Sequence, residues 1–183
     1  YGEATAILVG DALLTMAFDV LAQADNMDAV RELAQSAGLA GMVGGQFIDM
    51  EGEGKQHSLD HLQDIHRRKT GALIRASVRL GGMLAGGKET DLAALTAFGE
   101  HLGLAFQIAD DILDVVGNTA ELGKTAGSDA SNAKSTYPSI LGLDEARRLA
   151  DEAARAAVDA LAEFGAEADM FRNIARFVVE RTA

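Results

Sequence analysis

The residues best suited to chemistry are three carboxylates near the middle of the chain. Asp110, Asp111 and Asp114 lie within five positions of one another. At about 100° per residue, a helix turns all three toward one edge roughly 100° wide. That edge carries three further polar residues: Glu100, Gln107 and Asn118. Neighbouring carboxylates repel one another, so the pattern predicts a positively charged occupant.

The circumference around this acidic edge is apolar, which predicts a buried helix with one wet side. The apolar residues are Leu102, Leu104, Phe106, Ile108, Ile112, Leu113, Val115 and Val116. The alternative is a solvated acidic face, but apolar residues would not be expected on every other side of such a face.

The ligand atoms that this edge offers are all oxygens. The chain has no Cys, and the nearest His is His101. Oxygen ligands suit hard Mg²⁺, which proteins usually hold by one or two carboxylates together with waters and substrate phosphates. The aspartates therefore predict Mg²⁺ and, with it, a phosphorylated ligand.

Lys69 is the second candidate for a functional residue. On a helical wheel it lies at the centre of an apolar face formed by Leu62, Ile65, Ala72, Leu73, Ala76 and Leu80. A lysine near a helix end can extend its ammonium to solvent, but Lys69 lies in mid-helix, so we expect an anionic partner inside the protein. Thr70 adds a hydroxyl beside it.

Other polar residues give weaker signals. Gln46 and Asp49 lie three residues apart and so share a helix face, for which an ordinary exposed edge is the alternative. The four histidines have no metal-ligand spacing on one face, beyond a pair at a helix start. We expect all four at the surface: His57, His61, His66 and His101.

Residues 118–138 have a different composition, rich in Gly, Ser, Thr and Asn, with Lys124 and Lys134 as their only cations. Loops of this length in a compact domain are usually functional or disordered. Because this stretch directly follows the acidic helix, we expect it to fold over the acidic edge and bring two ammonium groups to a metal-bound anion. Disorder in the absence of ligand is the alternative.

The elements that must position these residues are predicted to be helices. The chain has one Pro, two Tyr and no Trp, and its abundant Ala and Leu favour helix over strand. Ser58 is a plausible N-cap. We expect an all-α fold in one domain, with helices at about 2–24, 28–37, 40–50, 58–84, 90–117, 143–164 and 168–181.

Composition also limits the partners and the compartment. Sixteen basic against 28 acidic residues give a net charge of −12, which argues against nucleic acid and against an anionic membrane surface. No apolar run reaches the roughly 18 residues of a membrane span, and the start lacks a signal-peptide pattern. With no Cys, the chain suits a reducing compartment, so we expect a cytoplasmic protein.

Five motifs in order resemble the polyprenyl synthetase family, and in particular bacterial farnesyl or geranylgeranyl diphosphate synthases. DDILD at 110–114 is preceded by FQ and followed by LGK, GSD and KSTYP. Upstream of it lie GEATAILVGDAL at 2–13, GGQFID at 44–49 and HRRKTGALIRASVRLG at 66–81. The resemblance covers essentially the whole chain.

The resemblance implies an all-helical bundle of the isoprenoid synthase type. Such enzymes join an allylic diphosphate to isopentenyl diphosphate, with Mg²⁺ ions bridging the allylic diphosphate to two Asp-rich motifs. Carried onto this sequence, the second motif is Asp110, Asp111 and Asp114, with Asp110 the foremost direct ligand. The residues contacting diphosphate would be Lys69, Lys124 and Lys134. Thr70 and Gln107 would face the developing allylic cation, and Gln46 and Asp49 would line the same cavity.

Parts of the family pattern have no counterpart in the sequence. The first Asp-rich motif, the residues that bind isopentenyl diphosphate and those that stop the growing chain lie upstream of the position matching Tyr1 in the family. Residues 1–183 thus resemble the C-terminal part of a single synthase domain, and we expect this chain alone to be inactive. The C-terminus, 181–183, also lacks the basic tail of some members.

Two other functions remain alternatives. One is a non-catalytic partner subunit, although such a subunit has no use for a repulsive acidic edge. The other is a terpene cyclase, although cyclases usually carry a differently spaced Asn/Ser/Glu motif. The first helix, with Ala4, Ala6 and Gly10 beside aliphatic residues, resembles the family's dimer-forming helix, so we expect a homodimer.

Overall fold

A computed structural model describes residues 2–122 and 135–181, and for 117–122 it describes the backbone only. The described residues contain helices and no strand, which confirms the predicted all-α fold. The elements are α1 (Glu3–Ala22), α2 (Met27–Ala37), α3 (Met42–Glu51), α4 (Leu59–His66), a π-helical turn (Arg67–Gly71), α5 (Ala72–Leu84), α6 (Glu89–Leu122), α7 (Tyr137–Leu141), α8 (Leu143–Ala160), a 3₁₀ turn (Ala166–Ala168) and α9 (Asp169–Glu180).

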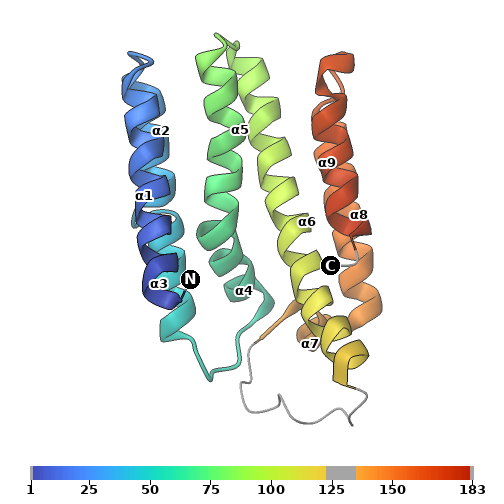
Figure 1. Ribbon diagram of the computed structural model, residues 1–183. Helices are drawn as coiled ribbons and strands as arrows, with labels where there is room; N and C mark the ends of the chain where they lie inside the picture. Colours follow the sequence, from blue (N-terminus) through green and yellow to red (C-terminus); the bar gives the residue numbers. More distant parts are fainter. Residues whose placement is uncertain (1, 123–134, 182–183) are drawn as a thin grey trace.

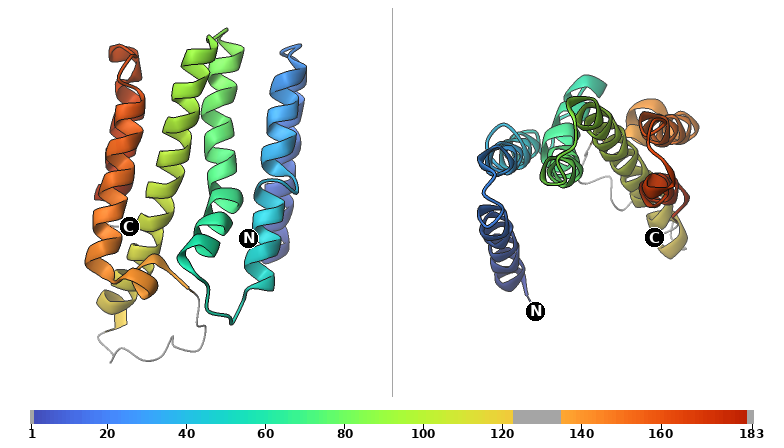
Figure 2. Two further views of the ribbon diagram at one scale, coloured as in Figure 1. Left: turned by 180° about the vertical axis from the view of Figure 1, so that it is seen from behind. Right: turned by 90° about the horizontal axis from the view of Figure 1, so that it is seen from above.

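The long helices stand side by side in a curved layer (Figure 1). Helix α2 packs on α5, α5 packs on α6, and α6 packs on α8 and α9. Seen from above, α1 lies at one edge of this layer and α8 and α9 lie at the other (Figure 2). Helix α6 is therefore the central element, with partners on both sides.

The buried core follows α6 along most of its length. Phe98 is fully buried and meets Phe171 of α9 edge to face, with ring centroids 5.6 Å apart. Farther along α6, Ile108 packs with Leu62 of α4 and Tyr137 of α7. This apolar burial is the main driving force for the bundle.

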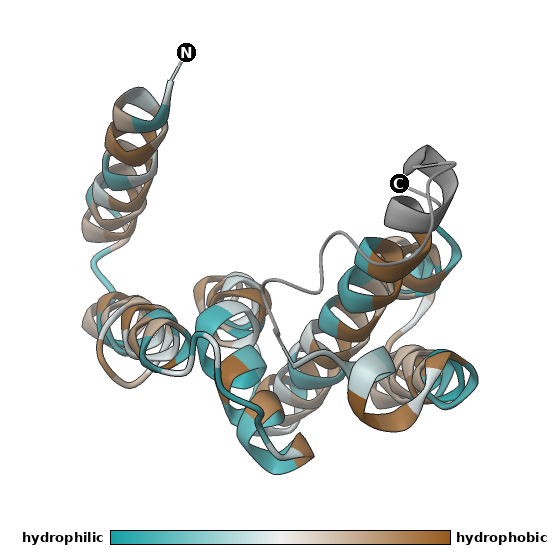
Figure 3. Ribbon diagram, turned by 90° about the horizontal axis from the view of Figure 1, so that it is seen from below, coloured by the Kyte–Doolittle hydropathy of each residue, from teal (hydrophilic) through white to brown (hydrophobic). Residues whose placement is uncertain are grey.

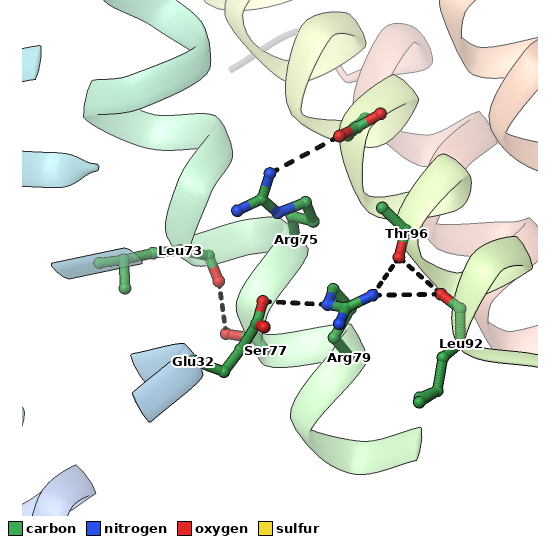
Figure 4. A network of polar contacts seen from close by, with 8 residues as sticks. Glu32, Leu73, Arg75, Ser77, Arg79, Leu92 and Thr96 are labelled. Carbon is green, nitrogen blue, oxygen red and sulfur yellow. Dashed lines mark hydrogen bonds and ion pairs between the residues drawn. The ribbon is translucent and has the colours of Figure 1, made fainter. Parts of the chain in front are cut away.

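A network of polar contacts joins α2, α5 and α6 (Figure 4). The Arg79 guanidinium on α5 donates from Nε to Glu32 Oε1 on α2 at 2.9 Å. It also donates to the Thr96 hydroxyl on α6. Because the Arg79 and Glu32 side chains are only 23% and 17% exposed, this pair is better shielded from solvent than an ordinary surface ion pair.

The structure confirms several predicted helix boundaries, but one predicted loop has the wrong length. Ser58 caps α4 as expected, accepting from the His61 backbone N–H at 3.3 Å. The predicted loop at 118–138 is too long, since α6 continues to Leu122 and α7 begins at Tyr137. The breaker residues Gly117 and Asn118 misled the prediction, because an established helix tolerates single unfavourable residues.

Two helices reach the length and hydropathy of a membrane span, which corrects the expectation that none would. These are Glu3–Ala22 and Glu89–Val116, with mean hydropathies of 1.7 and 1.3. Half of the second window is buried inside the protein, as in ordinary core helices, so length and composition alone are weak evidence for a span.

Candidate diphosphate and metal site

Lys69 lies in the π-helical turn between α4 and α5. A π turn inserts one extra residue into a helix, and such turns occur frequently at functional sites. The Lys69 ammonium donates to Asp49 Oδ2 on α3 at 2.6 Å, and the two side chains are 31% and 19% exposed. The expected anionic partner inside the protein is therefore present in this structure, and it is Asp49.

A cavity of about 460 Å³ lies beside this ion pair. Its lining residues come from α3, α4, the segment between them, and the segment before α7. They are Gln46, Asp49, Met50, Gly52, Glu53, Gly54, Lys55, His57, Leu62, Ile65 and Ser135. Gln46 and Asp49, which share one face of α3, thus both line this cavity.

Ser135 closes one wall of this cavity. Its hydroxyl accepts from the His57 backbone N–H at 2.8 Å, which ties the segment before α7 to the segment before α4. Lys124 and Lys134, both predicted to contact diphosphate, lie outside the described residues.

Asp110 occupies an open position on α6, with half of its side chain exposed. Its Oδ1 accepts from Arg181 Nη2 at 3.1 Å, and the Arg181 guanidinium also lies 4.6 Å from the centre of the Phe106 ring. Phe106 and Asp110 are four residues apart and share a helix face. One cation thus already contacts the carboxylate that we named as the foremost metal ligand.

Asp111 does not share the wet edge, which corrects the prediction of one exposed acidic seam. Its side chain is only 8% exposed, and Oδ2 accepts from the Tyr137 backbone N–H at 2.9 Å. Asp111 therefore holds the first turn of α7 against α6. The sequence offered no local signal for this contact, since the partners are 26 residues apart.

The Tyr137 side chain beside Asp111 is fully buried. Burial raises the pKa of the Tyr137 hydroxyl to about 12, and the negative charge of Asp111 adds to this increase. The ring of His66 lies 5.7 Å from the Tyr137 ring and is buried. The prediction that every histidine lies at the surface is therefore wrong for His66, because the face of α4 that carries it is covered by α7.

The last turns of α6 are less covered than we expected. Asp114 is exposed, and Val115 and Val116 are 41% and 37% exposed. Gln107, one turn before Asp111, is buried, and Thr70 in the π turn is half-buried. The apolar surroundings predicted for the acidic edge therefore extend only to Leu113.

The carboxylates of α6 fit part of a Mg²⁺ site. Among the side chains that the structure describes, in residues 2–116 and 135–181, no three acidic, His or Cys side chains converge on one point. Asp110 and Asp114 are four residues apart on one helix face, and both are open to solvent. One or two carboxylates are what Mg²⁺ usually takes from a protein when phosphate and water oxygens complete its coordination.

Comparison with known proteins places the chain in a family. The polyprenyl synthetase family matches residues 1–172. The farnesyl diphosphate synthase of Escherichia coli (strain K12) is 48% identical over 99% of this chain and 64% of its own length. The farnesyl diphosphate synthase of Bacillus subtilis (strain 168) is 46% identical over 82% of this chain and 54% of its own length.

Solved structures give the same assignment. A polyprenyl synthase from Caulobacter crescentus CB15, complexed with calcium and isoprenyl diphosphate, superposes with a TM-score of 0.85. It is 29% identical, and the match covers 98% of this chain and 67% of that one. A Helicobacter pylori geranyltransferase complexed with magnesium and isoprenyl diphosphate gives a TM-score of 0.74 at 31% identity, covering 98% of this chain and 61% of that one.

The chain belongs to the polyprenyl synthetase family. It spans between about half and two thirds of the length of these relatives. The family assignment made from the five sequence motifs is thereby confirmed, and so is the fold that it implied.

Proposed function

We propose that this chain is the C-terminal part of the single domain of a prenyltransferase, which condenses an allylic diphosphate with isopentenyl diphosphate. Family membership and 48% identity to a farnesyl diphosphate synthase support this reaction class. The structural observation that carries it is the Lys69 ammonium, held by Asp49 at 2.6 Å beside a cavity of about 460 Å³.

The reaction requires that negative charge be neutralised as it develops. The allylic carbon–oxygen bond breaks, and its electron pair leaves with the diphosphate. The isopentenyl double bond then attacks the allylic cation, and loss of a proton restores a double bond. Fixed cations are most effective for this purpose in a water-poor site. We assign that task to Lys69, Lys124 and Lys134.

Support for the two loop lysines comes from the chain on either side of them. Ser135, the residue after Lys134, lines the cavity, and the end of α6 leads into the segment that contains Lys124. We further assign Gln46 and Asp49 to the cavity wall around the substrate. The oxygens of Thr70 and Gln107 would then stabilise the allylic cation.

Mg²⁺ would be held through Asp110, Asp111 and Asp114, with Asp110 and Asp114 supplying the exposed oxygens. When bound, the ion would neutralise diphosphate oxygens and promote departure of the leaving group. The Oδ2 atom of Asp111 accepts from the backbone N–H of Tyr137 at the start of α7. The main contribution of Asp111 is therefore to orient the segment before α7, which includes the cavity residue Ser135. The Arg181 contact at Asp110 would be exchanged for the metal ion.

The assembly and compartment are part of the same proposal. We infer a cytoplasmic homodimer formed through α1, which has exposed apolar side chains from Ile7 to Val20. Figure 3 shows apolar segments along α1 where it stands apart from the other helices. An exposed apolar surface of this kind usually marks an interaction site.

Replacing Asp110 tests the proposed function. In the full-length protein, Asp110→Asn should lower the rate of prenyl transfer by about 100-fold or more, since one preorganised charge contributes on that scale. The melting temperature should change little, because half of this side chain is exposed. Asp159→Asn, an exposed residue on α8, is the matched control. Full activity of Asp110→Asn would refute the metal assignment.

A further inference from the structure

Three helices meet backbone to backbone at the π-helical turn that carries Lys69. On one side lies Gly45 of α3, where an added Cβ would be 2.3 Å from the Lys69 nitrogen and 2.7 Å from its Cα. On the other side lies Gly103 of α6, where an added Cβ would be 3.0 Å from the Gly71 Cα. A Cβ at position 45 would overlap the backbone of the turn, and a Cβ at position 103 would force a small shift of the turn.

The turn enclosed by these glycines is an irregular piece of helix. A π turn has poorer intrinsic stability than the α-helix on either side, so tertiary contacts must hold it in place. Both α3 and α6 pack on this turn. The two glycines thus let the neighbouring helices support the turn on opposite sides.

The geometry of α3 links this packing to the ion pair. Gly45 and Asp49 are one helical turn apart and lie on the same face of α3. The contact at Gly45 therefore sets the distance between the helices, and Asp49 acts across that distance to reach the Lys69 ammonium at 2.6 Å. A bulkier residue at position 45 would move either the Lys69 backbone or the whole of α3.

We propose that Gly45 and Gly103 are positioning residues for Lys69. Neither touches substrate. Their missing side chains allow α3 and α6 to hold the π turn where the Lys69 ammonium, oriented by Asp49, meets a diphosphate. This inference rests on the proposed role of Lys69, so the experiment must separate a failure of that role from a failure of the positioning.

The test is a double-mutant cycle in the full-length protein. Binding of inorganic pyrophosphate at saturating Mg²⁺ is measured by calorimetry for wild type, Gly45→Ala, Lys69→Ala and the double variant, at a temperature where all remain folded. Displacement of a binding group by about 1 Å can cost up to about 100-fold, so we expect Gly45→Ala to weaken binding at least tenfold. In the Lys69→Ala background, Gly45→Ala should weaken pyrophosphate binding little further, because the effects of coupled residues are not additive.

The control is Gly81→Ala in α5, where an added Cβ meets no atom within 4 Å. It should bind pyrophosphate as wild type does. If Gly45→Ala fails to fold, Gly103→Ala carries the same cycle, because its overlap at 3.0 Å is milder.

The possible failures are distinguishable. If Lys69→Ala binds pyrophosphate as tightly as wild type, the proposed function of Lys69 is wrong. If Lys69→Ala binds weakly and Gly45→Ala or its substitute binds normally, the positioning role is wrong. If Gly45→Ala weakens pyrophosphate binding by the same factor with and without Lys69, the glycine serves only general packing. That result would also overturn the inference.

Discussion

Helices α1 and α6 have similar composition and opposite surroundings. Both contain long windows of high mean hydropathy, 1.7 in Glu3–Ala22 and 1.3 in Glu89–Val116. Only 6% of the α1 window is buried, against 50% of the α6 window. The more apolar helix is thus the more exposed one.

The difference arises from the neighbours of each helix. Helix α6 lies between α5 on one side and α8 and α9 on the other, whereas α1 packs mainly on α2. The end of α1 contributes Leu14, Phe18 and Leu21 to a small cluster. Its exposed apolar side chains are Ile7, Leu8, Val9, Leu13, Met16 and Val20. Apolar composition therefore indicates a surface to be covered, and the covering partner of α1 is, in our proposal, a second copy of the chain.

The largest contrast should come from truncating one large side chain in each helix. Phe98→Ala in α6 removes a fully buried ring and should cost about 3–5 kcal/mol of unfolding free energy. Leu8→Ala in α1, where the side chain is 66% exposed, should cost less than about 0.5 kcal/mol in the monomer. Denaturant unfolding under monomeric conditions measures both. Equal costs would contradict the assigned burial.

A pH experiment examines the contact between α6 and α7, where Tyr137 of α7 lies against Asp111 of α6. The pKa of Tyr137 is raised from 10.0 to about 12 in the folded protein. Its stabilising contribution is therefore complete below pH 10 and is lost as the pH rises through 12. The loss should amount to about 2–3 kcal/mol.

Tyr137→Phe is the control for this pH experiment. The difference in unfolding free energy between wild type and Tyr137→Phe should decline above pH 10, while titration of lysines affects both proteins alike. If the two proteins lose stability in parallel, the raised pKa of Tyr137 is refuted.

Two glycines provide a third contrast, with effects of opposite sign. Gly99 of α6 lies against α5, where an added Cβ would be 2.7 Å from the Arg75 Cα, so Gly99→Ala should destabilise the protein by about 1–3 kcal/mol. Gly10 of α1 has no atom near its added Cβ, so Gly10→Ala should stabilise the monomer by about 0.5–1 kcal/mol. Thermal unfolding of both variants measures whether each one stabilises or destabilises the protein. If both variants destabilise it by similar amounts, the predicted difference between α1 and α6 is wrong.

The smallest change in stability should accompany a change in assembly. Leu13→Glu places a charge on the exposed face of α1, where Leu13 is 56% exposed. The unfolding free energy of the monomer should change by no more than about 0.5 kcal/mol. The mass in solution should fall from that of a dimer to that of a monomer, as measured by light scattering. A dimer that survives this substitution would place the interface elsewhere.

Much of the local structure was predictable because its causes are local. The 3.6-residue period located the long helices, and the hydroxyl of Ser58 marked the start of α4. Lys69 was recognisable as a functional candidate, because a cation in mid-helix among apolar residues needs an anionic partner. The π turn around it was not recognisable, since an inserted residue changes the phase of the helix without altering the pattern enough to detect.

The site contacts that the sequence did not reveal join residues far apart in the chain. The Arg181 guanidinium reaches Asp110 over 71 positions, and the Tyr137 backbone reaches Asp111 over 26. The sequence marked Arg181 only as part of a C-terminus that lacks the basic tail of some family members. A cation directly after the last helix was the one sequence feature that could have indicated this contact. Nothing in the sequence indicated that the last helix ends beside Phe106.

Residue order alone was sufficient to specify helices, caps and the charged residues that could bind a diphosphate, because those properties depend on side chains within a few turns of one another. Burial and pairing required the folded bundle, because they depend on which surfaces meet. Helices α1 and α6 both have a high mean hydropathy, and they differ in burial because α1 has a neighbour on one side and α6 has neighbours on both.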